Sequence, residues 1–409
     1  MRATLQCRAC GCSSGQKILD LGVQPLANNL LSPDDLGRSE PVFPLCLAIC
    51  TSCWLLQLTD IVPPVELFSQ YVYFSSFSDT LLSHAADAVA NYRREFALGH
   101  ESFVVEIASN DGYLLKNFVA AGVPCLGIEP AANIAKVATE RGIPTISEFF
   151  GFKLAAELAG QGRSADLILG NNVFAHVPDI NGFVAGLARL LKPQGRIVLE
   201  FPYACDLIEH IEYDTIYHEH VFYFTLTALR SLFARHELEV FDVELLHIHG
   251  GSLRLYTAHR GACVVRPAVA ALLDEEQKKG VASVGYYDGF GERVRRIRED
   301  LVRLLSELKA AGHSIGAYGA SAKGSTLLNY CGLGRDTIDF VADRSTYKHG
   351  RLTPGTHLPI LASEELAKRQ PDYTLMLTWN FADEILQQQH DYRAQGGKFI
   401  IPIPAVKIV

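Results

Sequence analysis

Short apolar runs alternate with stretches of helical periodicity through the middle of the chain, which is the pattern of an open α/β sheet. The apolar runs predict strands at residues 103–108, 125–130, 166–173 and 195–202. Strands separated by helices pair in parallel, and their carboxyl ends meet at one edge of the sheet. We therefore predict an α/β fold with a central Rossmann-like domain whose ligand site lies at that edge.

Further elements are expected on both sides of this sheet. From Asp79 to Phe96 the apolar positions recur with a helical period. Residues 238–246 and 252–259 predict two strands that pair antiparallel at the sheet edge, and residues 264–308 are largely helical by their spacing. Apolar runs then predict a second Rossmann-like sheet, with strands at residues 314–318, 337–343, 373–380 and 397–402.

Two cysteine pairs mark an N-terminal unit. Cys7 and Cys10 form one C-x-x-C pair, and Cys50 and Cys53 form another about forty residues later. Each pair can place two thiolates on one zinc ion, and two pairs complete a closed tetrahedral site. Such a metal organises the fold and leaves no open position for catalysis. The alternative is four free thiols in a small core.

Two nearby cysteines, Cys12 and Cys46, could replace one ligand, although neither has the paired spacing. The prolines between the pairs predict loops and short strands there. We expect the chain to divide into a zinc-binding module over residues 1–70, a central domain over 71–262 and a C-terminal α/β domain over 263–409.

Composition narrows the class of protein. The chain has 409 residues, of which 48% are hydrophobic and 20% charged, as in ordinary globular proteins of two or three domains. A net charge of −8 argues against a nucleic-acid partner. The sequence has neither an N-terminal apolar run nor a stretch that could span a bilayer. We expect a cytoplasmic protein with reduced thiols and no membrane partner, either a monomer or a small homo-oligomer.

Polar and small residues gather at the carboxyl ends of the central strands. The candidate ligand groups are Glu106, Ser109, Asn110, Asp111, Gly112, Glu129, Pro130, Asn171 and Asn172. The first turn lacks the G-x-G-x-x-G of dinucleotide sites, and an acid after the second strand can bind both hydroxyls of a ribose. This order favours S-adenosylmethionine. A doubly wound domain that binds another molecule is the alternative.

The densest group of titratable side chains follows the sheet, at residues 212–223. It contains His218, Glu219 and His220, with Tyr217 beside them. Imidazole can move a proton near neutral pH, a carboxylate can orient it, and a tyrosine hydroxyl can bind an oxygen that gains charge. A polar surface turn or a structural metal site is the alternative. In an extended strand, His218 and His220 would share one face, opposite Glu219.

The glycine- and serine-rich turn after residue 318 is a candidate phosphate site. A helix follows the turn, and the N–H groups at its start, together with Ser321 and Lys323, suit an anion. The turn does not match the Walker A pattern. An exposed lysine on an ordinary α/β turn is the alternative.

In this order, the motifs resemble those of the nucleotide-sugar C-methyltransferases, and most of all the dTDP-sugar 3-C-methyltransferases of tetronitrose biosynthesis. The resemblance spans essentially the whole chain. It is carried by the cysteine pairs and by residues 106–112, 172–178, 212–223, 249–254 and 318–324. It implies a zinc module, a central methyltransferase domain that binds S-adenosylmethionine, and a C-terminal domain that helps to hold a nucleotide. One departure is Ala108, where the family often has glycine.

The resemblance also implies a reaction. A carbon next to a ketone loses a proton because the charge moves to the ketone oxygen as an enolate, which then attacks the methyl group of the sulfonium cofactor. It implies His220 as the base, Tyr217 and Glu219 as groups that bind or orient the substrate and the base, and His176 across the site. The substrate would be a nucleotide-linked 4-keto-deoxysugar.

Several alternatives stay open at this level. His218 is the second candidate for the base and otherwise a substrate contact, while Tyr71 would help to close the cavity. The carrier can be dTDP or GDP, and the methylated carbon can be C-3, which we favour, or C-5. An O- or N-methyltransferase, a zinc-containing oxidoreductase and a non-catalytic nucleotide binder are the competing functions.

Overall fold

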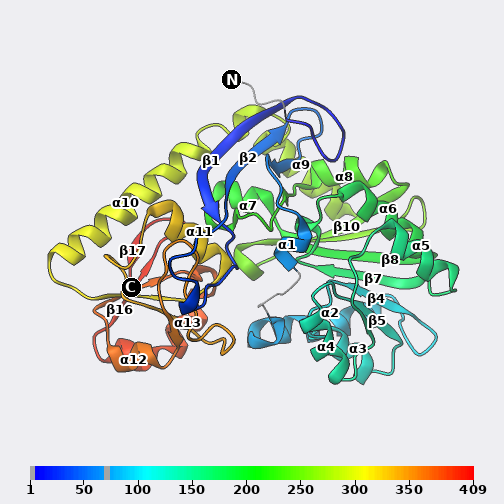
Figure 1. Ribbon diagram of the computed structural model, residues 1–409. Coiled ribbons are helices and arrows are strands. Elements are labelled where there is room, and N and C mark those ends of the chain that lie inside the picture. Colours follow the sequence, from blue (N-terminus) through cyan, green and yellow to red (C-terminus); the bar gives the residue numbers. More distant parts are fainter. Residues whose placement is uncertain (1–4, 69–73) are drawn as a thin grey trace.

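Three β-sheets organise the chain in the computed structural model, which describes residues 5–68 and 74–409 (Figure 1). The central and C-terminal domains form two lobes, and the strands of the N-terminal module lie across both of them (Figure 1). In this described part, no helix is both long and apolar enough to cross a bilayer.

The central sheet has the strand order β10-β11-β8-β7-β4-β5-β6. Its parallel strands are β4 (Val104–Ile107), β5 (Cys125–Ile128), β6 (Thr145–Ile146), β7 (Ala165–Asn171) and β8 (Leu191–Pro202). The antiparallel edge is formed by β10 (Leu238–Leu246) and β11 (Ser252–His259), as predicted. The helices of this domain are α3 (Leu115–Ala120), α4 (Ala132–Glu140), α5 (Phe152–Gly160), α6 (Ile180–Leu190), α7 (Ala204–Glu209) and α8 (Leu226–Ala234).

The C-terminal sheet repeats this plan without an obvious repeat in sequence. Its order is β14-β13-β12-β15-β16-β17, and only β17 runs antiparallel to its neighbour in the described sheet. The strands are β12 (Ile315–Tyr318), β13 (Val341–Asp343), β14 (Ile360–Ala362), β15 (Tyr373–Met376), β16 (Lys398–Ile401) and β17 (Lys407–Ile408). The helices are α11 (Ala322–Cys331), α12 (Glu365–Arg369), α13 (Ala382–Gln388) and α14 (His390–Ala394). The prediction of a second Rossmann-like domain is confirmed.

The N-terminal module is more regular than predicted. Two long strands, β1 (Gly15–Pro25) and β2 (Val42–Cys50), pair antiparallel where we expected loops and short strands, so that expectation is wrong. The alternating leucines of both strands are buried, and this apolar face outweighs the prolines, which lie at the end of β1, in the connection and, for Pro44, in the first part of β2. The sheet continues through β3 (Leu56–Leu58) to β9 (Phe222–Tyr223).

Helices lie in the two segments that connect the three domains. A short helix α1 (Pro64–Phe68) precedes α2 (Asp79–Glu95), which buries the predicted apolar face against the central sheet. Further along the chain, α9 (Pro267–Lys279) is followed by α10 (Phe290–Ala310), which packs on β1 and α11 (Figure 1). Both helices lie in the region predicted to be helical.

Two apolar cores cross the expected domain boundaries. One joins the cysteines of the N-terminal module to one face of the central sheet. The other joins leucines of β1, β2 and β3 to the C-terminal sheet and to Ile216, in the stretch before the histidines. The module is therefore packed into both lobes, and its integrity bears on the position of the histidine stretch.

Candidate active site

The turn after β4 is held in a left-handed backbone conformation. The φ angles of Ala108, Asn110 and Gly112 are +53°, +50° and +78°, and Asn172 after β7 has +53°. Such angles are costly for residues other than glycine and collect at functional sites. They also explain why glycine suits position 108, although Ala108 adopts the same conformation.

Several buried oxygens at these strand ends lack a hydrogen-bond partner. Within residues 5–68 and 74–409, Glu106 Oε2, Ser109 Oγ, Asp111 Oδ1 and Asn171 Oδ1 make no hydrogen bond. Leaving such a group unpaired costs about 1–3 kcal/mol, so a polar ligand that reaches them would be stabilised. Burial raises the pKa of Glu106 well above its usual range, and the charges of Glu129 and Asp111 raise it further.

Glu129 follows β5, as predicted, and its carboxylate contacts the turn after β4. Its carboxylate accepts hydrogen bonds from the N–H groups of Asn110 (3.0 Å) and Ala131 (2.9 Å). Burial raises the pKa of Glu129, and these two donors oppose that rise. A carboxylate has about four acceptor positions, so two bonds leave capacity for hydroxyl groups of a ligand. Pro130 follows the acid directly.

Side chains that the sequence did not single out support the turn. The N–H of Ser75 donates to Asn110 Oδ1 over 2.9 Å, and the Ser76 hydroxyl donates to Asp111. Arg141 donates to Asp111 Oδ2 over 2.8 Å. The segment before α2 thus lies on the candidate cofactor turn. The neighbouring Tyr71 lies outside the described residues.

His220 has both ring nitrogens engaged. Its Nδ1–H donates to the carbonyl of Thr215 over 2.8 Å, and Tyr217 Oη lies 2.8 Å from Nε2. Because a carbonyl can only accept, the proton of the neutral ring is on Nδ1 and Nε2 is the basic nitrogen. The Tyr217 hydroxyl therefore donates to Nε2.

His176 faces His220 from the end of the β7 loop. The ring centroids are 4.8 Å apart and the ring planes cross at 82°. Burial lowers the pKa of His176 to about 4, with a hydrogen bond to the backbone of Asn172 opposing that effect. His176 is therefore neutral near pH 7, and the structure brings it together with His220 and Tyr217.

The histidine stretch is a turn between η4 (Tyr213–Thr215), a 3-10 helix, and β9. The expectation that His218 and His220 share one face was made only for an extended strand, and it does not apply to this turn. His218 turns toward the N-terminal module, with Nε2 3.3 Å from the carbonyl oxygen of Phe43 and its ring edge-on to the Phe43 ring. Burial lowers the pKa of His218.

Glu219 points to the same module as His218. Its Oε1 accepts a hydrogen bond from Asn28 Nδ2 over 2.6 Å, and the residue is only 3% exposed. Asn28 is 191 residues away in sequence, so the bond joins the N-terminal module directly to the catalytic candidates.

At the C-terminal turn, Ser321 caps α11 by accepting from the N–H of Gly324 over 3.1 Å. Lys323 does not point to solvent, so the alternative of an exposed lysine is wrong. Its Nζ donates to Asn380 Oδ1 over 3.0 Å and lies 4.6 Å from the centre of the Trp379 ring. Trp379 Nε1 in turn donates to Asp214 over 2.7 Å.

This lysine is partly buried and belongs to an interdomain charge cluster, which we define as Lys323 with the buried acids Asp214 and Glu212. Burial lowers the pKa of Lys323, and the two acids oppose that effect. Burial also raises the pKa of Asp214 to about 6 and that of Glu212 to about 8, while Lys323 lowers both. Asp214 lies in η4, one residue before the carbonyl that holds His220, so the C-terminal domain supports the turn that carries His220.

The four paired cysteines converge. The sulfurs of Cys7, Cys10, Cys50 and Cys53 all lie within 4.8 Å of one another. The Sγ atoms of Cys7 and Cys53 are 3.6 Å apart, as are those of Cys10 and Cys50. Four thiolates in such a cluster fit a tetrahedral zinc ion.

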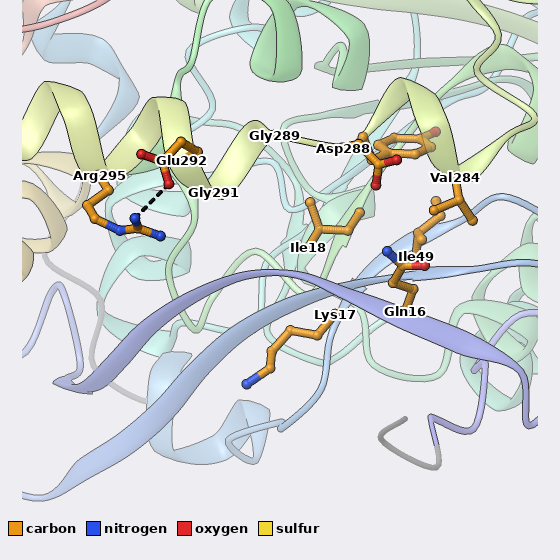
Figure 2. Close-up of a pocket in the computed structure, with 11 residues that line it drawn as sticks. Gln16, Lys17, Ile18, Ile49, Val284, Asp288, Gly289, Gly291, Glu292 and Arg295 are labelled. Carbon is orange, nitrogen blue, oxygen red and sulfur yellow. Dashed lines mark hydrogen bonds and ion pairs between the residues drawn. The ribbon is translucent and has the colours of Figure 1, made fainter. Parts of the chain in front are cut away.

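None of the candidate site residues lines the surface cavity shown in Figure 2. This cavity of about 320 Å³ lies between β1 and the start of α10, and an ion pair of Arg295 with Glu292 is at its edge. We therefore do not assign the chemistry to this cavity.

Three family models match the chain in sequence. They describe a zinc binding domain at residues 7–68, a methyltransferase domain at 81–243 and a C-methyltransferase C-terminal domain at 247–404. The C-methyltransferase NovU of Streptomyces niveus is 38% identical over 405 residues, which is 99% of this chain and 96% of that protein.

The chain belongs to the C-methyltransferase family. This C-methyltransferase uses S-adenosylmethionine and carries zinc, in agreement with the polar strand ends and the cysteine cluster. The likeness to other methyltransferases is narrower. A ubiquinone biosynthesis O-methyltransferase of Bartonella bacilliformis is 32% identical over 22% of this chain and 38% of its own length. The structure of magnesium protoporphyrin IX methyltransferase from Synechocystis covers 44% of this chain and 83% of its own, with 14% identity and a TM-score of 0.36.

The position of Glu129 gives a prediction for cofactor binding. Glu129→Ala should weaken the binding of S-adenosylmethionine by about 1–3 kcal/mol, because ribose hydroxyls would lose their acceptor. Titration calorimetry measures this directly. Glu140→Ala, at the exposed end of α4, is the matched control and should bind as the wild type does. Unchanged affinity in Glu129→Ala would place the ribose elsewhere.

Proposed function

We propose that this C-methyltransferase adds a methyl branch to the carbon next to the ketone of a nucleotide-linked 4-keto-deoxysugar in the cytoplasm. We favour C-3 as the methylated carbon and dTDP as the carrier. The observation that supports the proposal most is His220, whose Nδ1 proton is fixed on the Thr215 carbonyl so that Nε2 is the basic nitrogen. Such a base suits removal of a proton from carbon.

In this proposal His220 Nε2 takes the proton from the carbon next to the ketone. For Nε2 to accept this proton, its hydrogen bond from Tyr217 opens first, and the freed Tyr217 hydroxyl can donate to the ketone oxygen as it becomes an enolate oxygen. The Thr215 carbonyl stabilises the imidazolium through Nδ1–H. The C–H electron pair moves into the enolate, so no redox partner is needed.

Neighbouring groups complete the proposed site. His176 is neutral, so it can donate one hydrogen bond to the substrate through its single ring N–H. Its buried surroundings exclude water from the site. Glu219 accepts hydrogen bonds and is proposed to bind a sugar hydroxyl or orient the base. When bound, S-adenosylmethionine supplies an electrophilic methyl group. Tyr71, from outside the described residues, is proposed to help close the cavity, and His218 is kept as a more distant substrate contact.

The nucleotide is proposed to lie against the C-terminal domain. The start of α11 offers backbone N–H groups, and a Cβ at Gly324 would come within 2.8 Å of Leu377, so the turn depends on close packing there. Ser321 and Lys323 are proposed to meet the diphosphate, with Lys323 shared between the ligand and the interdomain charge cluster.

That double role gives a prediction. Lys323→Met should lower the free energy of unfolding by about 1–3 kcal/mol, because it removes the hydrogen bond to Asn380 and the positive charge that acts on buried Asp214, and it should raise the KM for the nucleotide sugar. The double variant Lys323→Met with Asp214→Asn should regain much of the stability but keep the high KM. A native KM in the stable double variant would show that Lys323 only supports the fold.

Product analysis tests the proposed substrate. A panel of dTDP- and GDP-linked 4-ketosugars, incubated with S-adenosylmethionine, should yield one product heavier by one methylene, with NMR placing the new methyl on carbon. Methyl transfer to oxygen or nitrogen would favour the competing methyltransferase classes, and no transfer to any ketosugar would overturn the proposed substrate class.

A further inference from the structure

The N-terminal zinc module touches the histidine stretch at three points. Strand β3 pairs with β9, and the N–H of Leu58 donates to the carbonyl of Val221 over 2.9 Å. The carbonyl of Phe43 lies against His218, and Asn28 donates to Glu219. Of these contacts, only the bond from Asn28 joins a side chain of the module to the side chain of a candidate catalytic residue.

The loop that carries Asn28 is held on both sides. Leu26 and Ala27 before it are buried, and Leu31 after it pairs with Leu352 of the C-terminal domain through two backbone hydrogen bonds of 2.8 and 3.0 Å. Within the loop, the N–H of Leu30 donates to the carbonyl of Asn28 over 2.9 Å. The amide of Asn28 is thus presented from a fixed backbone.

The chemistry of the contact has a defined direction. A carboxylate can only accept, so the amide of Asn28 must present its N–H₂ group to Glu219. A hydrogen bond to an ionised acceptor is stronger than one between neutral groups, and this one is made by a carboxylate that is almost fully buried. The bond favours one orientation of Glu219, the residue directly before His220.

We propose that Asn28 is a positioning residue for methyl transfer, which fixes the Glu219 carboxylate and thereby makes the zinc module part of the active site. This inference rests on the proposed function. It assigns the module a task beyond its own stability, because the loop between its two long strands sets the geometry of a group 191 residues away.

Three variants test the proposal. Asn28→Ala removes the donor, and kcat should fall about 10- to 100-fold, the usual weight of a hydrogen bond to a charged group. Zinc content and the affinity for S-adenosylmethionine should stay native. Asn29→Ala, at the exposed neighbouring amide, is the matched control and should keep the wild-type kcat.

Asn28→Asp tests the role of the hydrogen bond through the pH profile of kcat, which would not change if Asn28 only supported the fold. Two carboxylates at this distance share a proton, so one of them titrates at a raised pKa. Below that pKa, the protonated carboxyl group introduced by Asn28→Asp donates as the amide did and activity is retained; above it, the two carboxylates repel and activity is lost. The variant should therefore show an added falling limb in the pH profile of kcat that Asn28→Ala and the wild type lack, since the titration of His220 is common to all three.

Carboxyl carbon NMR of Glu219 separates this proposal from the proposed function. In the wild type the Glu219 carboxyl should titrate at a lower pH than in Asn28→Ala, whatever the substrate is. If that difference is seen but no ketosugar is methylated, the proposed function fails and the positioning contact stands. An active wild type together with native kcat in Asn28→Ala, or no added limb in Asn28→Asp, would overturn the assignment of Asn28.

Discussion

His220→Asn is expected to lower kcat by about 10²–10⁴-fold, which is the usual contribution of one positioned general base. This corresponds to roughly 3–5 kcal/mol of barrier. Asparagine keeps a donor that can face the Thr215 carbonyl but lacks a basic nitrogen, so proton removal fails while the turn is kept. The affinity for S-adenosylmethionine should be nearly native, because the residues proposed to bind it follow β4, β5 and β7 and not the turn that carries His220.

The neighbouring histidine is the matched control. His218→Asn should cost less activity, because His218 faces Phe43 in the N-terminal module rather than His176 and Tyr217. Steady-state rates and titration calorimetry on both variants make the comparison. A larger loss in His218→Asn than in His220→Asn would assign the base to His218.

Removal of zinc should have the largest effect on folding. Structural zinc contributes about 10–16 kcal/mol of apparent binding free energy in small zinc domains, so Cys50→Ser or a strong chelator should melt the N-terminal module. Activity should fall with it, since β2 and β3 lead through the sheet to β9 beside His220. Elemental analysis, limited proteolysis and thermal melting follow the three consequences.

Cys46→Ser is the control for this prediction. Cys46 lies in β2, four residues before Cys50, and is not one of the four converging sulfurs, so this variant should keep its zinc and its melting temperature. A folded and active preparation without metal would contradict the assignment of the cysteine cluster.

The sequence predicted the elements whose apolar pattern is uninterrupted over at least four residues. Strands β4, β5 and β7 and helix α2 lie where their periodicity placed them. Strands β6 and β14, of two and three residues, are too short to give a period. The β1–β2 pair was missed because prolines were given more weight than the alternating leucines that bury one face of each strand.

The sequence predicted the site residues that lie close together in the chain, but not those that come from distant segments. The grouping of His220 with Tyr217 was available from their spacing, whereas the turn that separates His218 from them depends on packing against Phe43. Ser76, Arg141 and Asn28 were missed because they reach the site from distant segments. The polar pair at positions 28 and 29, between apolar residues, was the only local signal of the last contact.

The most direct test of the proposed chemistry is deuterium uptake at the carbon next to the ketone. The wild type is incubated in heavy water with a dTDP-linked 4-keto-deoxysugar and without a methyl donor, and proton NMR follows that carbon against a sample without enzyme. We expect enzyme-dependent loss of the proton signal, and no such loss in His220→Asn. Methyl transfer by a wild type that never exchanges this proton would contradict an enolate formed by His220.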